Sequence, residues 1–130
     1  MNPIVYQQRR ANAWVTHMNQ TQSNLLLRNK GLMLFLQEKR CLQQDEAYIF
    51  VCRTSDGESA FPKALNYALA RNSDLKSYVG GVFIGVMNGK KTAQMIVCEA
   101  QSSGTQLLQE PIDEHTCGSG SIRVKERDVP

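Results

Sequence analysis

The chain has 130 residues, of which 42% are hydrophobic and 21% are charged, a composition that excludes disordered and collagen-like chains. Its length fits a single domain spanning residues 1–130, large enough to bury a core without a metal or a disulfide framework. The net charge is only +3, but residues 1–44 hold six basic side chains and one acidic side chain, an asymmetry that favours an anionic partner without specifying it.

The N-terminal segment predicts an amphipathic helix that begins at about residue 3. Asn2 can cap the helix, and Pro3 suits its first position because proline has no backbone N–H to lose there. One sector of the helical wheel holds the apolar residues expected to face a core: Ile4, Ala11, Trp14, Val15, Met18 and Leu25. Residues 19–24 are poor helix formers and are expected to kink or interrupt the helix, and Gly31 is typical of a helix stop.

Two apolar segments that follow are interpreted as strands. Residues 32–36, LMLFL, come directly after the predicted stop of the first helix, and their position favours a strand. Residues 47–53, AYIFVCR, combine β-branched and aromatic side chains without polar alternation. That pattern is typical of a strand covered on both faces, so this segment is predicted to be a central strand of the sheet.

A second helix is predicted at about residues 60–71, packed on one face of the sheet. Ser59 can cap it, after the turn residues TSDGES. Its apolar side chains recur at helical spacing: Phe61, Ala64, Leu65, Ala68 and Leu69. Asn72 and Ser73 favour a turn at its end.

Asn88-Gly89 between two apolar runs predicts a hairpin of strands 78–87 and 90–99, because a two-residue turn of this kind requires positive φ at both positions. Met87 would then pair with Lys90. In that register one apolar face, expected to be core, holds Val82, Ile84, Val86, Ala93, Met95 and Val97. The opposite face carries Phe83 between two glycines.

The rest of the chain is predicted to be a long irregular connection, residues 102–119, and an edge strand at residues 120–127. In that strand Ile122 and Val124 would point inward, and basic side chains would point outward and discourage unwanted pairing. Together the elements predict an α+β fold: a small single domain with a largely antiparallel sheet, an N-terminal amphipathic helix and a second helix packed on the sheet.

Phe83 is the first candidate for partner binding. Its same-strand neighbours, Gly81 and Gly85, have no side chains and could leave a groove beside the ring for a peptide, a ligand or a second copy of the chain. The alternative is that another layer covers this face and that the glycines permit close packing.

The second candidate is an edge of the first helix, where Arg10, His17 and Arg28 fall together on the helical wheel beside Trp14. Tryptophan bordered by arginine is typical of binding hot spots and of surfaces that grip phosphates or stacked bases. The alternative is a core tryptophan whose basic neighbours are solvated and cover the edge of the core with their stems.

The polar segment 110–117 and the cysteines carry little specific chemistry. His115 and Cys117 lie close together in this segment, but no second histidine follows to complete a metal site or a catalytic set. Cys41, Cys52 and Cys98 complete the set of four cysteines, which contains no CxxC pair, so reduced thiols in the cytosol are expected. No metal site, cofactor or catalytic residue is predicted.

These features favour a small non-enzymatic protein-interaction module, such as an inhibitor, adaptor or accessory factor, that acts through surface contacts. The alternative is a nucleic-acid-binding accessory protein that uses the basic N-terminal third. An enzyme that uses the 110–117 segment is the third hypothesis. A cytoplasmic location is expected, because no secretion signal or membrane span is evident. A protein partner is expected, with nucleic acid or a homo-oligomer as further possibilities and no membrane association.

Overall fold

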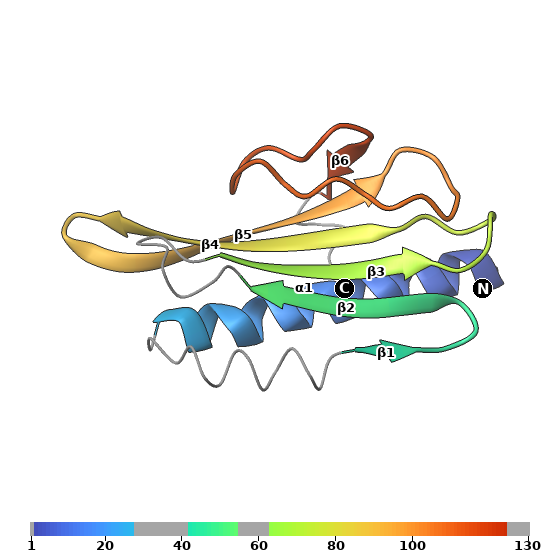
Figure 1. The fold of residues 1–130 in the computed structure, drawn as a ribbon, viewed down its shortest axis with the longest axis horizontal. Coiled ribbons are helices and arrows are strands. Elements are labelled where there is room, and N and C mark those ends of the chain that lie inside the picture. The colour runs from blue at the N-terminus through green and yellow to red at the C-terminus, as the bar shows by residue number, and fades with distance from the viewer. Residues whose placement is uncertain (1, 28–41, 55–62, 125–130) are drawn as a thin grey trace.

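The computed structural model describes residues 2–27, 42–54 and 63–124. In this part of the chain one long helix, α1 (Pro3–Leu27), lies along one face of a six-stranded antiparallel sheet (Figure 1). The strands are adjacent in chain order: β1 (Gln43–Gln44), β2 (Tyr48–Thr54), β3 (Lys63–Ala70), β4 (Tyr78–Met87), β5 (Lys90–Ala100) and β6 (Ser121–Arg123). The predicted α+β class, with its N-terminal helix and antiparallel sheet, is confirmed.

Helix α1 begins where the sequence predicts. The Asn2 side chain accepts a hydrogen bond from the Ile4 N–H at 2.8 Å, which satisfies one of the unpaired donors of the first turn. The helix then continues unbroken to Leu27. The predicted interruption at residues 19–24 is therefore wrong, because several of these polar side chains face the sheet and are buried there.

The buried face of α1 is rotated from the predicted one toward its polar residues. Apolar Ala11, Val15, Met18 and Leu26 are buried as expected of a core face, but Asn12, Asn19, Gln22 and Ser23 are buried among them. Ile4 is exposed, and Trp14 is only partly buried. The apolar sector of the helical wheel alone therefore did not identify the residues at the centre of the contact between α1 and the sheet.

Three buried amides, Asn19, Gln22 and Asn66, form a polar seam between α1 and the sheet. The Asn66 amide donates to Asn19 Oδ1 at 2.8 Å, and the Asn19 amide donates to the Ile96 carbonyl at 3.0 Å. Gln22 is fully buried, yet neither of its polar side-chain atoms has a hydrogen-bond partner. The Asn19 bonds fix the helix relative to β3 and β5, whereas Gln22 carries a desolvation cost.

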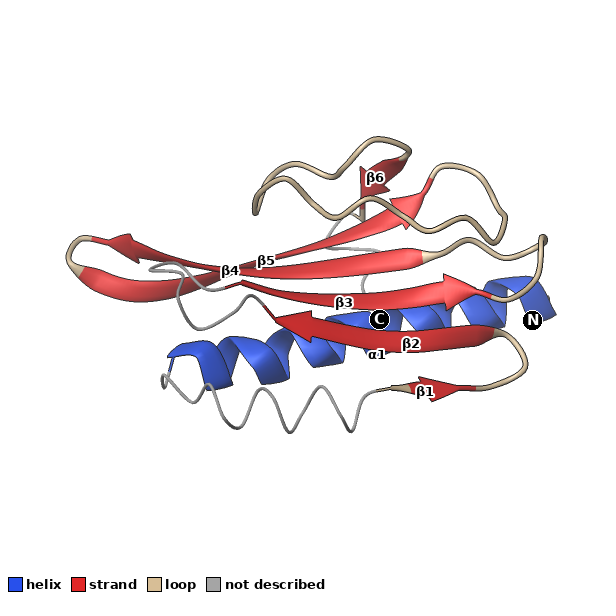
Figure 2. Cartoon of the chain, viewed as in Figure 1, coloured by secondary structure: helices blue, strands red, loops and turns tan. Residues whose placement is uncertain are grey.

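The predicted second helix is wrong within the described residues, where residues 63–70 form strand β3 (Figure 2). Small residues alternate with large ones along β3, which places Ala64 and Ala68 under α1 and Leu65 and Tyr67 on the opposite face. Because both faces are covered, nearly every position is apolar, and a helical spacing can be found in such a run by coincidence. Residues 60–62 lie outside the described residues.

The hairpin of β4 and β5 has the predicted register. Met87 pairs with Lys90, and the turn residues Asn88 and Gly89 have φ values of 52° and 76°. Val82 and Ile84 are buried beneath the C-terminal part of α1. The hairpin extends past the end of the helix (Figure 1), so Val86, predicted to be core, is 64% exposed. Met95, predicted on the same core face, is also exposed, at 41%.

Two of the other strands differ in part from their predictions. Strand β2 confirms the predicted strand at residues 47–53, but it is second from an edge instead of central, since only β1 lies outside it. Strand β6 is an edge strand as predicted. Ile122 is exposed instead of inward, whereas Val124 packs against the core. The predicted strand at residues 32–36 and the helix stop at Gly31 lie outside the described residues.

Candidate functional site

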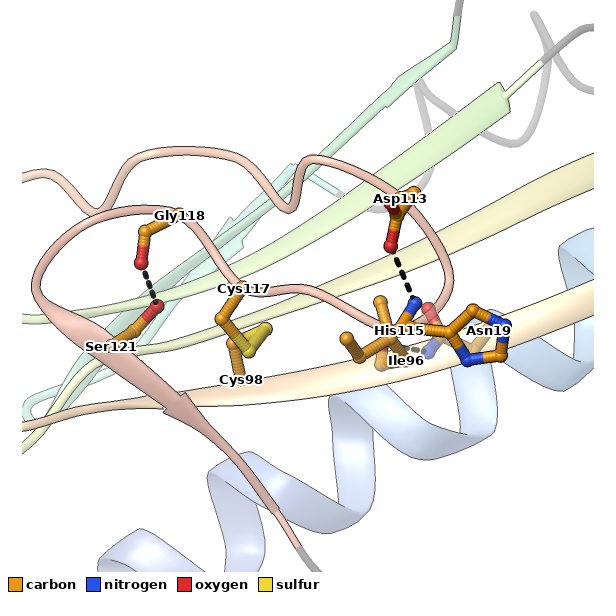
Figure 3. Close-up of a disulfide and its surroundings, with 8 residues drawn as sticks. All are labelled: Asn19, Ile96, Cys98, Asp113, His115, Cys117, Gly118 and Ser121. Carbon is orange, nitrogen blue, oxygen red and sulfur yellow. Dashed lines mark hydrogen bonds between the residues drawn. A yellow bond between two sulfur atoms is a disulfide. The ribbon is translucent and has the colours of Figure 1, made fainter.

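A disulfide-bonded loop covers the sheet face opposite α1 (Figure 3). Cys98 of β5 is joined to Cys117, with their Cα atoms 5.9 Å apart. Leu108 packs in the core cluster beneath this loop, and the side chain of Pro111 is fully buried. The turn at its end is closed by a hydrogen bond from the Ile112 N–H to the Thr116 carbonyl at 2.9 Å. The loop is therefore anchored to the sheet by a covalent bond and by apolar packing.

The prediction of reduced thiols is wrong. No cysteine among the described residues is a free thiol, and Cys52 is also disulfide-bonded. Cys41 lies outside the described residues. Because disulfides form and persist in oxidising compartments, this finding already argues against the cytosol. Cys117 also has no thiol to act as a nucleophile, which removes the central residue of the enzyme hypothesis.

Phe83 points toward the disulfide-bonded loop and is half-buried. A methyl group placed on Gly81 would lie 2.8 Å from the Phe83 ring and 3.3 Å from Pro111. The space above Gly81 is thus filled by the ring of Phe83 itself and by the loop. Gly85, on the other side, has no described residue within 4 Å of the position a methyl group would take, so space remains beside Phe83 toward the tip of the hairpin.

Arg10 and Trp14 connect α1 to the β1–β2 side of the sheet. Arg10 donates to Asp45 at 2.6 Å and to Gln7 at 2.7 Å, and its guanidinium lies 5.8 Å from the Phe50 ring centroid. The centroids of the Trp14 and Phe50 rings are 4.7 Å apart. Both side chains therefore have contacts within the chain that hold the helix in place.

The remaining predicted contact residues do not join this pair. His17 is exposed on α1, and Arg28 lies outside the described residues. Phe83 lies on the other face of the sheet, since it packs with the cluster beneath the loop. The structure thus brings Arg10 and Trp14 together and separates Phe83 from them.

Asp45 is a residue that sequence reasoning missed. Its carboxylate accepts hydrogen bonds from the Ala47 and Tyr48 N–H groups at 2.8 and 2.9 Å, in addition to the bond from Arg10. Partial burial opposes ionisation, but these hydrogen bonds outweigh it and hold the pKa of Asp45 below its ordinary value of 3.8. An aspartate directly before a predicted strand is a signal for such a turn.

Glu99 on β5 is paired with two polar side chains, those of Tyr78 and Lys76. The Tyr78 hydroxyl donates to Glu99 at 2.6 Å, and Lys76 lies 3.7 Å from the same carboxylate. Burial, with the Glu99 bond in second place, raises the pKa of Tyr78 well above its ordinary value. No group of three or more His, Cys, Asp or Glu side chains in the described part of the chain could hold a metal ion.

Most of the exposed large apolar side chains among the described residues fall in three groups. One group, Ile4, Val5 and Tyr6, lies at the start of α1. A second lies on the hairpin, at Val86, Met87 and Met95. A third lies on the disulfide-bonded loop, at Leu107 and Ile112. Surfaces of this kind are contact surfaces for proteins more often than reaction sites.

A long helix on an antiparallel sheet, with a disulfide-bonded loop on the other face, defines an α+β protein suited to an oxidising compartment. The chain belongs to the family described as type IV pilin-like G and H, whose model matches residues 8–119. No curated protein and no solved structure matches the chain significantly. None of the described helices has the length and apolar character that a membrane crossing requires.

Family membership corrects the predicted function and the predicted location. Type IV pilin-like proteins are structural components of pili or secretion systems, so the predictions of an inhibitor, adaptor or accessory factor and of a nucleic-acid-binding protein are wrong. Such proteins are typically exported to the periplasm or the cell surface, which also overturns the predicted cytoplasmic location; the regulatory role implied by an inhibitor or adaptor is overturned with the predicted function. Proteins of this family are typically structural components.

Proposed function

We propose that this chain is an exported structural subunit of a type IV pilus-like or secretion-system filament, without catalytic activity. The family match over residues 8–119 carries the proposal. The Cys98–Cys117 disulfide supports it independently, because such a bond indicates maturation outside the reducing cytosol. In this proposal residues 1–130 act as one domain, and the partners are other filament subunits, copies of this chain included.

The packing of α1 suits a subunit that transmits load between neighbours. The helix has 25 residues, so it is a rod of roughly 37 Å at about 1.5 Å per residue. It is joined to the sheet by the Asn19 hydrogen bonds, by the Arg10–Asp45 ion pair and by apolar packing around Val15 and Leu26. A helix held at several points along its length keeps its orientation when force is applied at one end.

The predicted contact residues take different parts in this proposal. Arg10 and Trp14 act indirectly, by positioning α1 through Asp45 and Phe50. His17 is exposed on the helix and is available for a direct contact with a neighbouring subunit. Phe83, half-buried beside the open space at Gly85, is a second direct candidate.

Cell fractionation tests the proposal. In cells of the source organism, the epitope-tagged chain should be recovered from sheared surface filaments or from the periplasmic and membrane fractions. Alkylation before and after reduction should show that Cys98 and Cys117 are oxidised there. Recovery of the chain only from the cytosol, with both residues reduced, would contradict export and the proposed function with it.

A further inference from the structure

The tip of the β4–β5 hairpin presents an apolar and basic surface. We define the hairpin tip as Val86, Met87, Lys90 and Lys91, all of which are exposed. The pairs Val86–Lys91 and Met87–Lys90 lie on opposite faces of the hairpin, so each face of the tip carries one apolar and one basic side chain. The hairpin projects beyond the end of α1 and beyond the loop layer (Figure 1). Neither lysine forms an ion pair with a described residue. The tip therefore has two charges and two large apolar side chains that nothing in the described part of the chain uses.

The disulfide-bonded loop carries exposed apolar side chains and half-buried acidic side chains. We define the acidic loop surface as Leu107, Ile112, Asp113 and Glu114. Leu107 and Ile112 are each 69% exposed. Asp113 accepts a hydrogen bond from the His115 N–H at 2.8 Å, and Glu114 lies 3.7 Å from the His115 side chain. Neither acid has a lysine or arginine partner among the described residues.

The two surfaces match in chemistry but belong to different parts of one molecule. Each set holds two exposed large apolar side chains and two charged side chains, and the charges of the two sets are of opposite sign. Tip against tip, or loop against loop, would place like charges together, which disfavours such pairs. Tip against loop joins unlike surfaces, and a contact of this heterologous kind leaves both molecules able to bind another copy.

We propose that the hairpin tip of one copy docks on the acidic loop surface of the next copy. Docked end-on, the tip brings Lys90 and Lys91 from its two faces toward Asp113 and Glu114, and the apolar side chains beside them are buried in the contact. The contact rests on the proposed function, since it is one of the subunit contacts of a filament. It requires no closed ring, so it can be repeated along an assembly.

Both surfaces are held rigidly, which lowers the cost of association. The hairpin ladder is paired as far as Met87 and Lys90, directly at the turn. The loop is held by the disulfide and by the Ile112–Thr116 hydrogen bond that closes its turn. The backbone on both sides is therefore ordered before the surfaces meet, so the loss of conformational entropy falls on the side chains.

The first test is zero-length cross-linking of the oxidised chain with a carbodiimide, which joins lysines to adjacent carboxylates. An equal mixture of ordinary and ¹⁵N-labelled chains separates links between molecules from links within one. The peptides of Lys90 or Lys91 should be joined to those of Asp113 or Glu114 in isotopically mixed pairs. The Lys63–Glu110 ion pair, at 3.0 Å within one chain, is the internal control and should give unmixed pairs. Absence of mixed tip-to-loop links, with the control link present, would overturn the proposal.

The second test exchanges the charges. The tip variant Lys90→Glu, Lys91→Glu and the loop variant Asp113→Lys, Glu114→Lys each carry like charges on both surfaces. Each variant alone should lose self-association in sedimentation velocity by at least about tenfold, since like charges are then opposed. An equal mixture should recover it, because each tip again meets an opposite loop. Loss without recovery in the mixture would refute the pairing.

The same variants separate this contact from membrane binding by the basic tip. Vesicles containing anionic lipid should not bind the wild-type chain more strongly than vesicles of neutral lipid. Binding that is lost in the tip variant and unchanged in the loop variant would replace the proposed contact with a lipid contact. The proposed function is tested separately, by the location of the wild-type chain. If wild type is found in filaments and the tip variant is incorporated equally well, only the tip-to-loop contact is wrong.

Discussion

Replacing Gln22 with methionine should stabilise the protein. Gln22 is fully buried on the sheet-facing side of α1, and neither its Nε2 nor its Oε1 has a hydrogen-bond partner. A buried polar group left unsatisfied costs about 1 to 3 kcal/mol. Methionine has a similar length and no strong polar atom, so Gln22→Met should raise the free energy of unfolding by about 1 to 3 kcal/mol.

The measurement is urea unfolding of the oxidised protein, followed by circular dichroism and by the fluorescence of Trp14, the single tryptophan in the chain. Gln20→Met is the matched control, because Gln20 is exposed on the same helix. The control should change the free energy of unfolding by no more than about 0.5 kcal/mol. A Gln22→Met variant that is less stable than wild type would refute the reasoning, since the amide would then have a partner, such as a bound water.

Three other outcomes are expected. The Cys98→Ala, Cys117→Ala double variant should lose about 3 kcal/mol in chemical denaturation, from a loop with a sequence separation of 19, and a single cysteine change that costs much less than the double change would contradict this. Gly80→Ala should lower the thermal midpoint, because the added methyl group would lie 2.5 Å from side-chain atoms of Val15 and Asn19. Gly85→Ala is the control: its methyl group would have no described residue within 4 Å, so the thermal midpoint should stay unchanged or rise slightly. The pKa of Asp45 is depressed in the fold, so the ionised carboxylate stabilises the protein above the ordinary pKa of 3.8, and this stabilisation is lost as the pH falls through the lower pKa of the folded state. Asp45→Asn should therefore flatten the decline of the free energy of unfolding measured between about pH 5 and pH 2.

Features set by neighbouring residues could be predicted from the sequence. The Asn2–Pro3 start of α1 is one, because the cap is made within the first turn. The β4–β5 register is another, because two residues of positive φ at Asn88 and Gly89 determine every later pair of the hairpin. Both predictions are confirmed. Each feature depends only on residues close together in the chain, so no contact with a distant segment is needed to determine it.

The candidate site could be predicted only in part. The sequence singled out Arg10, Trp14 and Phe83. It did not indicate that the Arg10 guanidinium would form an ion pair with Asp45, which lies 35 positions away in the chain. Nor did it indicate which side of Phe83 stays open, because that depends on where the disulfide-bonded loop crosses the sheet. The charged residues of the hairpin tip and of the loop were visible in the sequence, but the exposure of the two lysines and the absence of a lysine or arginine partner for the two acids among the described residues were not.

What the sequence by itself determined about this protein is local: the start of α1, the hairpin turn and the α+β class that follows from one amphipathic helix and several strands. Only the tertiary structure decided that residues 63–70 form β3, that Gln22 is buried and that Cys98 pairs with Cys117. The physical reason is the same in each case. A strand covered on both faces has no period of its own, and a buried amide or a disulfide depends on which distant segments the fold brings together.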